Sequence, residues 1–463
     1  MTTAKAKKTA SKAPLQRVLA ELRARGVRNV KLGGFDVDGV LRGKYVSLEK
    51  FASAADHGMG FCDVVFGWDI GDVLYDNAKA TGWHTGYPDA HATVDLSSLR
   101  HIPWEPSTAA FILDFQDPTG APLPISPRQL LQSVVDRAHG MGFSPLFSAE
   151  LEFFIFEETP ESLRAKGFAG LTPLSPGMFG YSWLRSSAHA ELVHAILDGC
   201  RDFDIEIEGM HTETGPGVYE CAIRYDEARR AADKAALFKT VVKELCARRG
   251  LTACFMAKWS EALPGCSGHL HQSLVGLKDG KSRFHDARGD RGTSATLRHY
   301  LGGLMKLMPE LSAIYWPTIN AYKRSAENTW APTTATWGHE NRTTAVRVIS
   351  GDPHATRIEY RQAGADLNPY LCMAANLAAG LWGIQNQVEP PPPVVGNGYD
   401  DREAPALPRN LRDAVASLNG SAVAREILGG AFVDHYVATR RWEVRQFERA
   451  VTTWELERYF ELV

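Results

Sequence analysis

The sequence lacks the features that assign a chain to a membrane or to a disulfide-stabilised fold. Its 463 residues include seven cysteines, and none of them forms a C-x-x-C pair. A disulfide framework or a zinc site is therefore not indicated, and a reducing, cytoplasmic setting is expected. The longest apolar run, residues 370–384, is shorter than a membrane span and contains Asn376, so it predicts a helix buried inside the protein.

Neither sign of charge dominates the sequence. The 51 Lys and Arg residues nearly balance the 54 Asp and Glu residues, which leaves a formal net charge of -3. This charge gives no basic field for nucleic acid and no polybasic patch for a membrane surface, so neither partner is expected. Residues 1–14 carry lysines among Ala, Thr and Ser without an apolar core, and they predict a solvated, disordered tail.

The length of the chain predicts two domains. Helical spacing at residues 15–25 precedes short strand-like runs, at 29–32, 34–37, 42–46, 92–96 and 109–114. A small sheet with one helix is therefore expected over residues 15–122, up to a turn-rich stretch. Beyond it, helical patterns alternate with strand patterns, the helical ones at 128–141, 189–203 and 227–249 and the strands at 146–156, 205–211, 218–224 and 253–257. The alternation predicts a larger domain of α+β or α/β type over residues 123–463.

The strand-like run at residues 147–156 places carboxylates among aromatic and aliphatic residues. Because residues two apart in a strand point to the same side, Glu150 and Glu152 project together from an apolar ribbon. Two adjacent buried anions need a cation to neutralise them, and a divalent metal held by carboxylate oxygens provides one. An edge strand with its polar face in water is the alternative for this run taken alone.

Three further segments place acidic, imidazole or guanidinium groups on strand-like ribbons. They contain His211, Glu213 and Glu220, then His269 and His271, and finally Arg357, Glu359 and Arg361. Each has an ordinary explanation, such as a polar strand face or a surface salt-bridge ladder. Together they suit Mg²⁺ or Mn²⁺ and phosphate oxygens. The set therefore predicts metal-assisted phosphoryl transfer without a Walker loop, which the sequence lacks.

Nine short motifs follow one another along the chain: Asp38-Gly39 with Arg42-Gly43-Lys44, Glu150-x-Glu152-Phe153, His211-x-Glu213 with Glu220, Phe255-Met256-x-Lys258, Gly268-His269-x-His271-x-Ser273, Asn320-Ala321-Tyr322-Lys323-Arg324, Asn341-Arg342 with Arg347, Arg357-Ile358-Glu359-x-Arg361 and Asn368-Pro369-Tyr370-Leu371. Through these motifs, which occur in family order, nearly the whole chain from about Lys31 onward resembles the bacterial glutamine synthetase superfamily.

The resemblance implies the fold and the metal sites. It predicts an α+β protein with an N-terminal β-grasp domain and an antiparallel-sheet catalytic domain. It also predicts a homo-oligomer, a dodecamer of two stacked hexamers with active sites between subunits. The implied metal ligands, for about two to three Mg²⁺ or Mn²⁺ ions per site, are Glu152, Glu213 and Glu220 at the first metal and Glu150, His269 and Glu359 at the second.

The resemblance also implies where ATP and glutamate bind. The arginines that would hold the glutamate carboxylate and the transferring phosphoryl group are Arg324, Arg342 and Arg361. The residues expected at ATP are Glu208, Tyr225, His271, Ser273, Arg347 and Arg357. Gly265, together with Glu152, falls at the glutamate site.

Two segments depart from the family pattern for binding ammonium. A family glutamate on a loop of the catalytic domain is replaced by Trp330, and Glu327 precedes it by three residues. The N-terminal loop that normally supplies an Asp and a Ser reads as residues 65–72, with Trp68 and Asp69. A tryptophan accepts no proton but offers an apolar or cation–π surface, which suits an alkyl or aryl amine better than ammonium. Residues 337–342, with an aromatic-Gly before Asn-Arg, are similar to the γ-glutamylpolyamine and γ-glutamylmonoamine synthetase branch.

The expected activity is therefore ATP-dependent joining of the γ-carboxylate of glutamate to a primary amine through γ-glutamyl phosphate. The alternatives are a true glutamine synthetase that uses ammonium and an inactive structural homologue. The amine stays open between a polyamine, ethanolamine, a short alkylamine and aniline. The base that deprotonates it stays open between Glu327, Asp69 and Asp72, and Tyr399 is a poor match to the tyrosine that enteric relatives modify.

Overall fold

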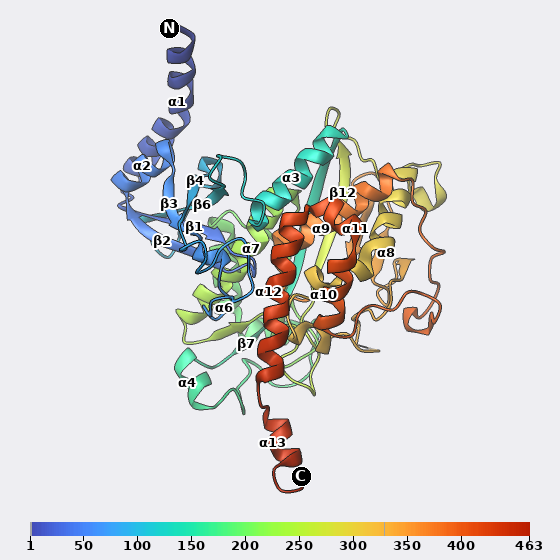
Figure 1. Cartoon of the computed structure of the whole chain (residues 1–463). Helices are drawn as coiled ribbons and strands as arrows, with labels where there is room; N and C mark the ends of the chain where they lie inside the picture. Colours follow the sequence, from blue (N-terminus) through green and yellow to red (C-terminus); the bar gives the residue numbers. More distant parts are fainter. Residues whose placement is uncertain (1, 328) are drawn as a thin grey trace.

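A computed structural model describes residues 2–327 and 329–463, with the side chains described from residue 13 onward. The chain folds into an N-terminal sheet with its helices and a larger sheet covered by helices, so the α+β expectation is confirmed (Figure 1). Within this described part, no helix combines the length and the apolar character that a membrane span requires.

The N-terminal part is a mixed sheet with a helix on either side of its first hairpin in the chain. Its elements are α1 (Thr2–Ala24), β1 (Asn29–Phe35), β2 (Leu41–Ser47), α2 (Leu48–His57), β3 (Met59–Cys62), β4 (Asp89–Val94), β5 (Arg100–His101) and β6 (Thr108–Gln116). The strand order is β2-β1-β6-β4-β3, with β5 on β6, and β1 runs parallel to β6. The structure thus confirms a small N-terminal sheet.

The stretch expected as a disordered tail over residues 1–14 lies at the start of α1, and its disorder stays a prediction. One local expectation for this part is corrected. The two short strands expected at 29–32 and 34–37 form the single strand β1. Gly34 permits this continuity, since a Cβ there would lie 2.4 Å from the Phe115 ring.

The larger sheet contains the strands that carry the acidic and imidazole side chains. Its strands are β7 (Phe143–Phe156), β8 (Ile207–Thr212), β9 (Val218–Ile223), β10 (Asp226–Glu227), β11 (Thr252–Cys254), β12 (Gly268–Gly276), β13 (Trp337–His339), β14 (Val346–Ile349) and β15 (Arg357–Tyr360). Their order is β13-β14-β15-β12-β7-β9-β8, with β10 and β11 also on β7. Every pair is antiparallel except β13 with β14. β7 therefore has partner strands on both sides and is not an edge strand.

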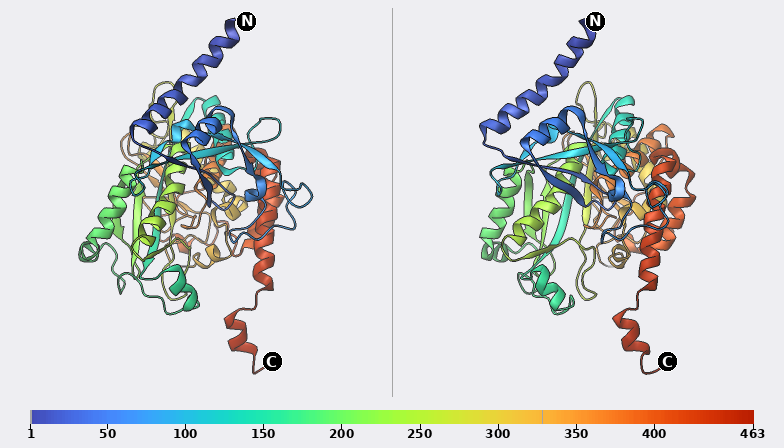
Figure 2. Two further views of the ribbon diagram at one scale, coloured as in Figure 1. Left: turned by 90° about the vertical axis from the view of Figure 1, so that its left-hand side faces the viewer. Right: turned by 60° about the vertical axis from the view of Figure 1, so that its left-hand side comes forward.

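Helices pack against this sheet and on one another. They are α3 (Pro127–Gly140), α4 (Pro160–Ala165), α5 (Trp183–Ala188), α6 (Ala190–Asp202), α7 (Ala228–Ala247), α8 (Ala295–Tyr315), α9 (Pro369–Gln385), α10 (Leu411–Gly420), α11 (Ala422–Leu428), α12 (Gly430–Arg449) and α13 (Thr453–Tyr459). α9 is buried along nearly its whole length, which confirms the expectation for the longest apolar run. Both ends of the chain, α1 and α13, extend away from the body (Figure 2).

A buried ion cluster joins the N-terminal sheet to the larger domain. Arg128 on α3 donates to Asp95 and Asp114 of the N-terminal part, at 2.7 Å each, and with two nitrogens to Asp233 on α7 at 2.8 Å. Arg229 on α7 also donates to Asp114, at 2.6 Å. A bidentate Arg–carboxylate pair has a fixed geometry, so this cluster holds α3 and α7 against the N-terminal strands.

Candidate active site

In the larger sheet, the register of the strands places the acidic and imidazole side chains next to one another. On β7, Glu150 lies opposite His269 of β12, and Glu152 lies opposite Glu220 of β9. On the other edge of β12, His271 lies opposite Glu359 of β15. Because these strands are adjacent, side chains that project from one face of the sheet converge there.

The first cluster consists of Glu150, His269 and Glu359. Their ligand atoms all lie within 4.8 Å of one another. His269 Nδ1 is 3.1 Å from Glu150 Oε1 and 3.4 Å from Glu359 Oε1, and His271 Nε2 is 3.7 Å from Glu150 Oε2. His269 and Glu359 are buried, and His269 Nε2 has no partner among the described atoms. These are the three residues expected at the second metal.

Electrostatics keep the carboxylates of the first cluster ionised. Burial raises the pKa of Glu359, but the charges of Arg361 and the two imidazoles outweigh it and lower the pKa to about 2. Burial also raises the pKa of Glu150, and the hydrogen bonds from His269 and His271 bring it below its usual range. Two ionised carboxylates and an imidazole in a buried site suit a hard divalent cation. The donor set therefore fits Mg²⁺ or Mn²⁺.

The second cluster consists of His211, Glu213 and Glu220, whose ligand atoms also lie within 4.8 Å of one another. His211 Nε2 is 3.1 Å from Glu220 Oε1. Burial raises the pKa of Glu220 to about 8, supported by the negative charges of Glu150 and Glu152 and opposed by the hydrogen bond from His211. A carboxyl group held among other carboxylates in this way is stabilised by a cation. This second cluster also fits a divalent metal.

Glu152, which was expected as a ligand of the first metal, accepts a backbone hydrogen bond beside the second cluster. It lies opposite Glu220 in register, but its Oε2 accepts a hydrogen bond from the Ser267 amide at 2.5 Å. His211, not Glu152, completes the second cluster in the structure. Sequence reasoning assigned no ligand role to His211, although its position two residues before Glu213 on a strand places both on one face.

Tyr181 is a second residue near the site that sequence reasoning missed. Its ring stacks on His211 with centroids 4.3 Å apart, and its backbone has a positive φ of 54°. The Glu213 and Glu220 charges add to the effect of burial and raise the pKa of the Tyr181 phenol. No spacing in the sequence indicated this contact, because Tyr181 belongs to the connection before α5.

Buried arginines lie beside the first cluster. Arg361 donates to Glu359, and Arg347 Nη1 donates to the other Glu359 oxygen at 3.1 Å. Arg324 is buried and donates to the Gln362 carbonyl at 3.0 Å. Burial lowers the pKa of Arg324. Arg342 is exposed on the turn after β13, so it is the arginine of this group most open to solvent.

The residues expected at ATP divide into two groups. His271 and Ser273 lie on β12, two and four residues after His269 and therefore on the same side of that strand. Arg357 Nε is 3.3 Å from His271 Nδ1, which places this arginine beside them. Glu208 and Tyr225 are exposed at the β8–β9 end of the sheet. A described contact joins His271 to Arg357, strand alternation places Ser273 on the side of His271, and no described contact joins Glu208 or Tyr225 to them.

Gly265 occupies a crowded position in the loop before β12. A Cβ at this residue would lie 2.3 Å from the Ala257 carbonyl oxygen and 2.9 Å from Arg324 Cγ. Only glycine fits there without moving Arg324. The close approach explains a glycine at the position expected to face glutamate.

The residues expected at the amine pocket occupy two separate places. Trp330 is 65% exposed with φ 62°, and Glu327 pairs with Arg402 at 2.9 Å. On the N-terminal loop, the Trp68 ring lies 5.0 Å from the Arg42 guanidinium carbon, and Asp69 Oδ2 accepts from Trp442 Nε1 at 3.0 Å. For the described residues, no hydrogen bond, ion pair or ring contact joins the two places within one chain.

The arrangement of these site residues was compared with known proteins through the sequence and the fold of the whole chain. The family model for the glutamine synthetase catalytic domain matches residues 124–459. The chain is 48% identical to type-1 glutamine synthetase 2 of Dictyostelium discoideum, over 94% of this chain and 84% of that protein. It is 38% identical to a glutamate–isopropylamine ligase of Pseudomonas sp, over 94% and 96% of the two chains. A solved GmaS–ADP complex superposes with a TM-score of 0.84 at 30% identity, over 96% and 99%. The chain therefore belongs to the glutamine synthetase family of ATP-dependent ligases, as its motifs indicated.

Proposed function

We propose that this protein joins the γ-carboxylate of glutamate to a primary amine at the expense of ATP. The observation that carries the proposal is Trp330, an exposed aromatic ring at the position where the family resemblance expects the glutamate that deprotonates ammonium. The similarity to glutamate–amine ligases, among them the isopropylamine ligase and a γ-glutamylethanolamide synthetase of Streptomyces coelicolor, supports the same substrate class.

The segment that carries Trp330 is held by its own hydrogen bonds. Ser325 Oγ donates to the Pro332 carbonyl at 2.7 Å, and Tyr399 Oη donates to the Ala331 carbonyl at 2.9 Å. A φ of 62° is uncommon for a residue with a large side chain. The bonds on both sides of Trp330 hold the loop in the conformation that presents the ring to solvent. We propose that the ring forms one wall of the amine pocket.

Among the three candidates for the base, the contacts favour Glu327. Asp69 Oδ1 accepts from the amides of its own loop, and its Oδ2 accepts from Trp442. Asp72 is bound to Arg42 at 2.6 Å. Among the described residues, Glu327 has an exposed pair with Arg402, and such pairs contribute little. We therefore propose that Glu327 removes the proton from the attacking ammonium group.

The chemistry follows from the charges of the site. Arg324 and Arg361 bind the carboxylates of glutamate, while Arg347 and Arg357 lie against the phosphates of ATP. The γ-carboxylate oxygen attacks the γ-phosphorus, ADP leaves, and γ-glutamyl phosphate forms. The neutral amine then attacks the acyl carbon and phosphate leaves. Divalent metals bound by the two clusters would neutralise the phosphate charge. Residues 67–72 of a neighbouring subunit would complete the pocket in a dodecamer.

A phosphate-release assay with glutamate and Mg-ATP tests the proposal. Ammonium is compared with isopropylamine, ethanolamine, putrescine and aniline at equal concentrations of free base. We expect kcat/KM for at least one amine to exceed that for ammonium about tenfold or more, a difference of about 1.4 kcal/mol in transition-state binding. A preference for ammonium over every amine would contradict the proposal.

A second candidate function is glutamine synthesis itself. The 48% identity to a type-1 glutamine synthetase favours it. The same assay separates the two functions through the ratio of turnover with amine to turnover with ammonium. An inactive homologue would show no turnover with any acceptor, although all six expected metal ligands are present in the sequence.

The loop that carries Trp330 supplies a narrower prediction. Replacing Trp330 by Glu adds a proton acceptor and removes the aromatic wall, so we expect the ratio of kcat/KM for amine to that for ammonium to fall about tenfold, in the range of a lost cation–π or apolar contact. Trp330→Phe retains an aromatic wall and is the matched control, with the ratio expected to stay close to that of the unmodified protein. An unchanged ratio in Trp330→Glu would remove Trp330 from the amine pocket.

A further inference from the structure

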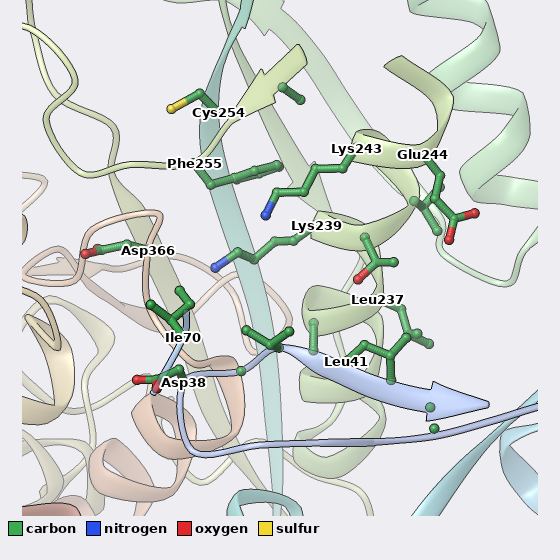
Figure 3. Close-up of a pocket in the computed structure, with 18 of the residues that line it drawn as sticks. Asp38, Leu41, Ile70, Leu237, Lys239, Lys243, Glu244, Cys254, Phe255 and Asp366 are labelled. Carbon is green, nitrogen blue, oxygen red and sulfur yellow. The ribbon is translucent and has the colours of Figure 1, made fainter. Parts of the chain in front are cut away.

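A cavity of about 1050 Å³ lies between the N-terminal hairpin and α7, apart from both acidic clusters. Figure 3 shows its walls, with Asp38 and Leu41 from the N-terminal part, Leu237 from α7 and Phe255 from the segment after β11. None of the residues of the two metal clusters is part of its lining. Its size is that of a site for a small organic molecule. The reaction described above makes no use of it.

Two lysines from one face of α7 point into this cavity (Figure 3). Lys239 and Lys243 are four residues apart in the helix and are therefore neighbours on its surface. Their Nζ atoms lie 5.8 and 5.7 Å from the centre of the same ring, Phe255. The two ammonium groups therefore both lie near this ring.

The described residues compensate these two charges only in part, since the charge of Asp366 acts on Lys239 from the same cavity. Lys239 Nζ donates to the Leu367 carbonyl at 3.0 Å, and no hydrogen bond or ion pair to Lys243 is found within the described part of the chain. Burial and the charge of Lys243 lower the pKa of Lys239 to about 8, and burial lowers the pKa of Lys243. Two like charges four residues apart on a helix destabilise it unless an anion lies between them. The lysine pair is therefore suited to bind an anionic ligand.

The remaining walls limit the kind of anion. Asp366 lies on the opposite side of the cavity, and its Oδ1 has no partner among the described atoms. A carboxylate there repels a dianion more than a monoanion. Part of the lining is apolar, with Leu163, Leu171 and Phe156, and the lining residue Phe168 is 67% exposed. Charged side chains also line the cavity, among them Lys31, Lys44 and Glu244. Apolar side chains left exposed at a cavity rim favour an apolar ligand body.

We infer that this cavity is a second small-molecule site, which binds a carboxylate carried on an apolar body between Lys239 and Lys243. The carboxylate accepts hydrogen bonds from the two ammonium groups, and the apolar part lies along Leu237, Phe156 and the rim. The Phe255 ring also stacks on Phe153, with centroids 5.1 Å apart, and Phe153 directly follows Glu152 on β7. The site therefore adjoins the back of the strand that carries the acidic groups.

Calorimetric titration of the full chain with 4-phenylbutyrate, and with its neutral amide 4-phenylbutyramide, tests the inference without any reaction. The titration contains saturating glutamate, so that the arginines of the reaction site do not compete for the probe. We expect the carboxylate to bind with a Kd below about 1 mM and the amide at least about tenfold more weakly. Equal affinity for the two probes, or no binding of the carboxylate, would overturn the inference.

The double variant Lys239→Met with Lys243→Met assigns the binding to this cavity. Methionine keeps much of the apolar stem while removing the charge, so the cavity retains its shape. We expect the variant to lose about tenfold or more in affinity for the carboxylate while its affinity for the amide is unchanged. Lys278→Met, at an exposed turn, is the matched control and should bind like the unmodified protein. Unchanged carboxylate binding by the double variant would show that the anion binds elsewhere. Because turnover is not measured, failure here leaves the proposed amine ligase activity untouched.

Discussion

Replacing Glu150 by Gln is expected to lower kcat/KM with glutamate and ATP by at least about 100-fold and to weaken Mn²⁺ binding in parallel. Glu150 and Glu359 are the two carboxylates of the first cluster, and His269 Nδ1 lies within 3.4 Å of both. Glutamine keeps the shape of the side chain and its hydrogen-bonding oxygen. It removes one of the two negative charges that a divalent metal requires.

The measurement combines steady-state phosphate release with titration of Mn²⁺ followed by electron paramagnetic resonance. Glu157→Gln is the matched control, because Glu157 directly follows the same strand and its side chain is exposed. We expect this control to bind metal and to turn over normally. Glu150→Gln with full turnover and undiminished Mn²⁺ affinity would show that the first cluster is not a metal site. Circular dichroism of both variants verifies that they fold.

Replacing Arg128 by Met is expected to lower the free energy of unfolding by about 3–5 kcal/mol at pH 7, because three carboxylates of a buried cluster lose their shared cation. Arg128 is buried and donates to Asp95, Asp114 and Asp233. After the substitution, Arg229 would be left to balance Asp95 and Asp114, and Asp233 would keep only the hydrogen bond from the Tyr370 hydroxyl at 2.7 Å. Denaturation in urea, followed by tryptophan fluorescence, measures the change.

The pH dependence of this effect gives an independent readout. Burial raises the pKa of Asp95, but the charge of Arg128 outweighs it and the net shift is downward. A carboxyl group with a lowered pKa stabilises the fold above its ordinary pKa, near 4, and the stabilisation is lost as the pH falls below that value. The difference between the unmodified protein and Arg128→Met should therefore be full at pH 7 and smaller near pH 3.

An exposed arginine provides the comparison for Arg128. Arg201 pairs with Asp198 and Asp202 on the surface of α6, and its side chain is 62% exposed. Arg201→Met should change the free energy of unfolding by less than about 0.5 kcal/mol. An equally small change for Arg128→Met would mean that the cluster does not hold the N-terminal sheet to the larger domain.

Much of the fold was predictable because its signals are local. The alternation at residues 146–156 predicted β7, and the helical spacings at 128–141, 189–203 and 227–249 predicted α3, α6 and α7 within one or two residues. The split of β1 into two strands was wrong, because the strand continues through Gly34, where the missing side chain leaves room for the Phe115 ring.

Only part of the candidate site was predicted from the sequence. Glu150, His269 and Glu359 converge as the resemblance implied. The other cluster contains His211, and Glu152 beside it accepts a hydrogen bond from the Ser267 amide that no spacing in the sequence reveals. Asp69 was a candidate base from the sequence, but in the structure its carboxylate accepts a hydrogen bond from Trp442, which lies 373 residues further along the chain. Contacts of this kind depend on segments that meet only in the folded protein.

The sequence by itself determined which side chains share a face of a strand, because the alternation of a strand is a property of neighbouring residues. It thereby placed Glu150 with Glu152, His269 with His271 and Arg357 with Glu359 and Arg361, and its motifs determined the family. Only the tertiary structure decided which faces meet. The order β9-β7-β12-β15 brings Glu150 to Glu359, and the packing of α7 beneath the N-terminal hairpin encloses Lys239 and Lys243. Both result from pairing between segments far apart in the chain, which is set by the burial of the whole core and not by local spacing.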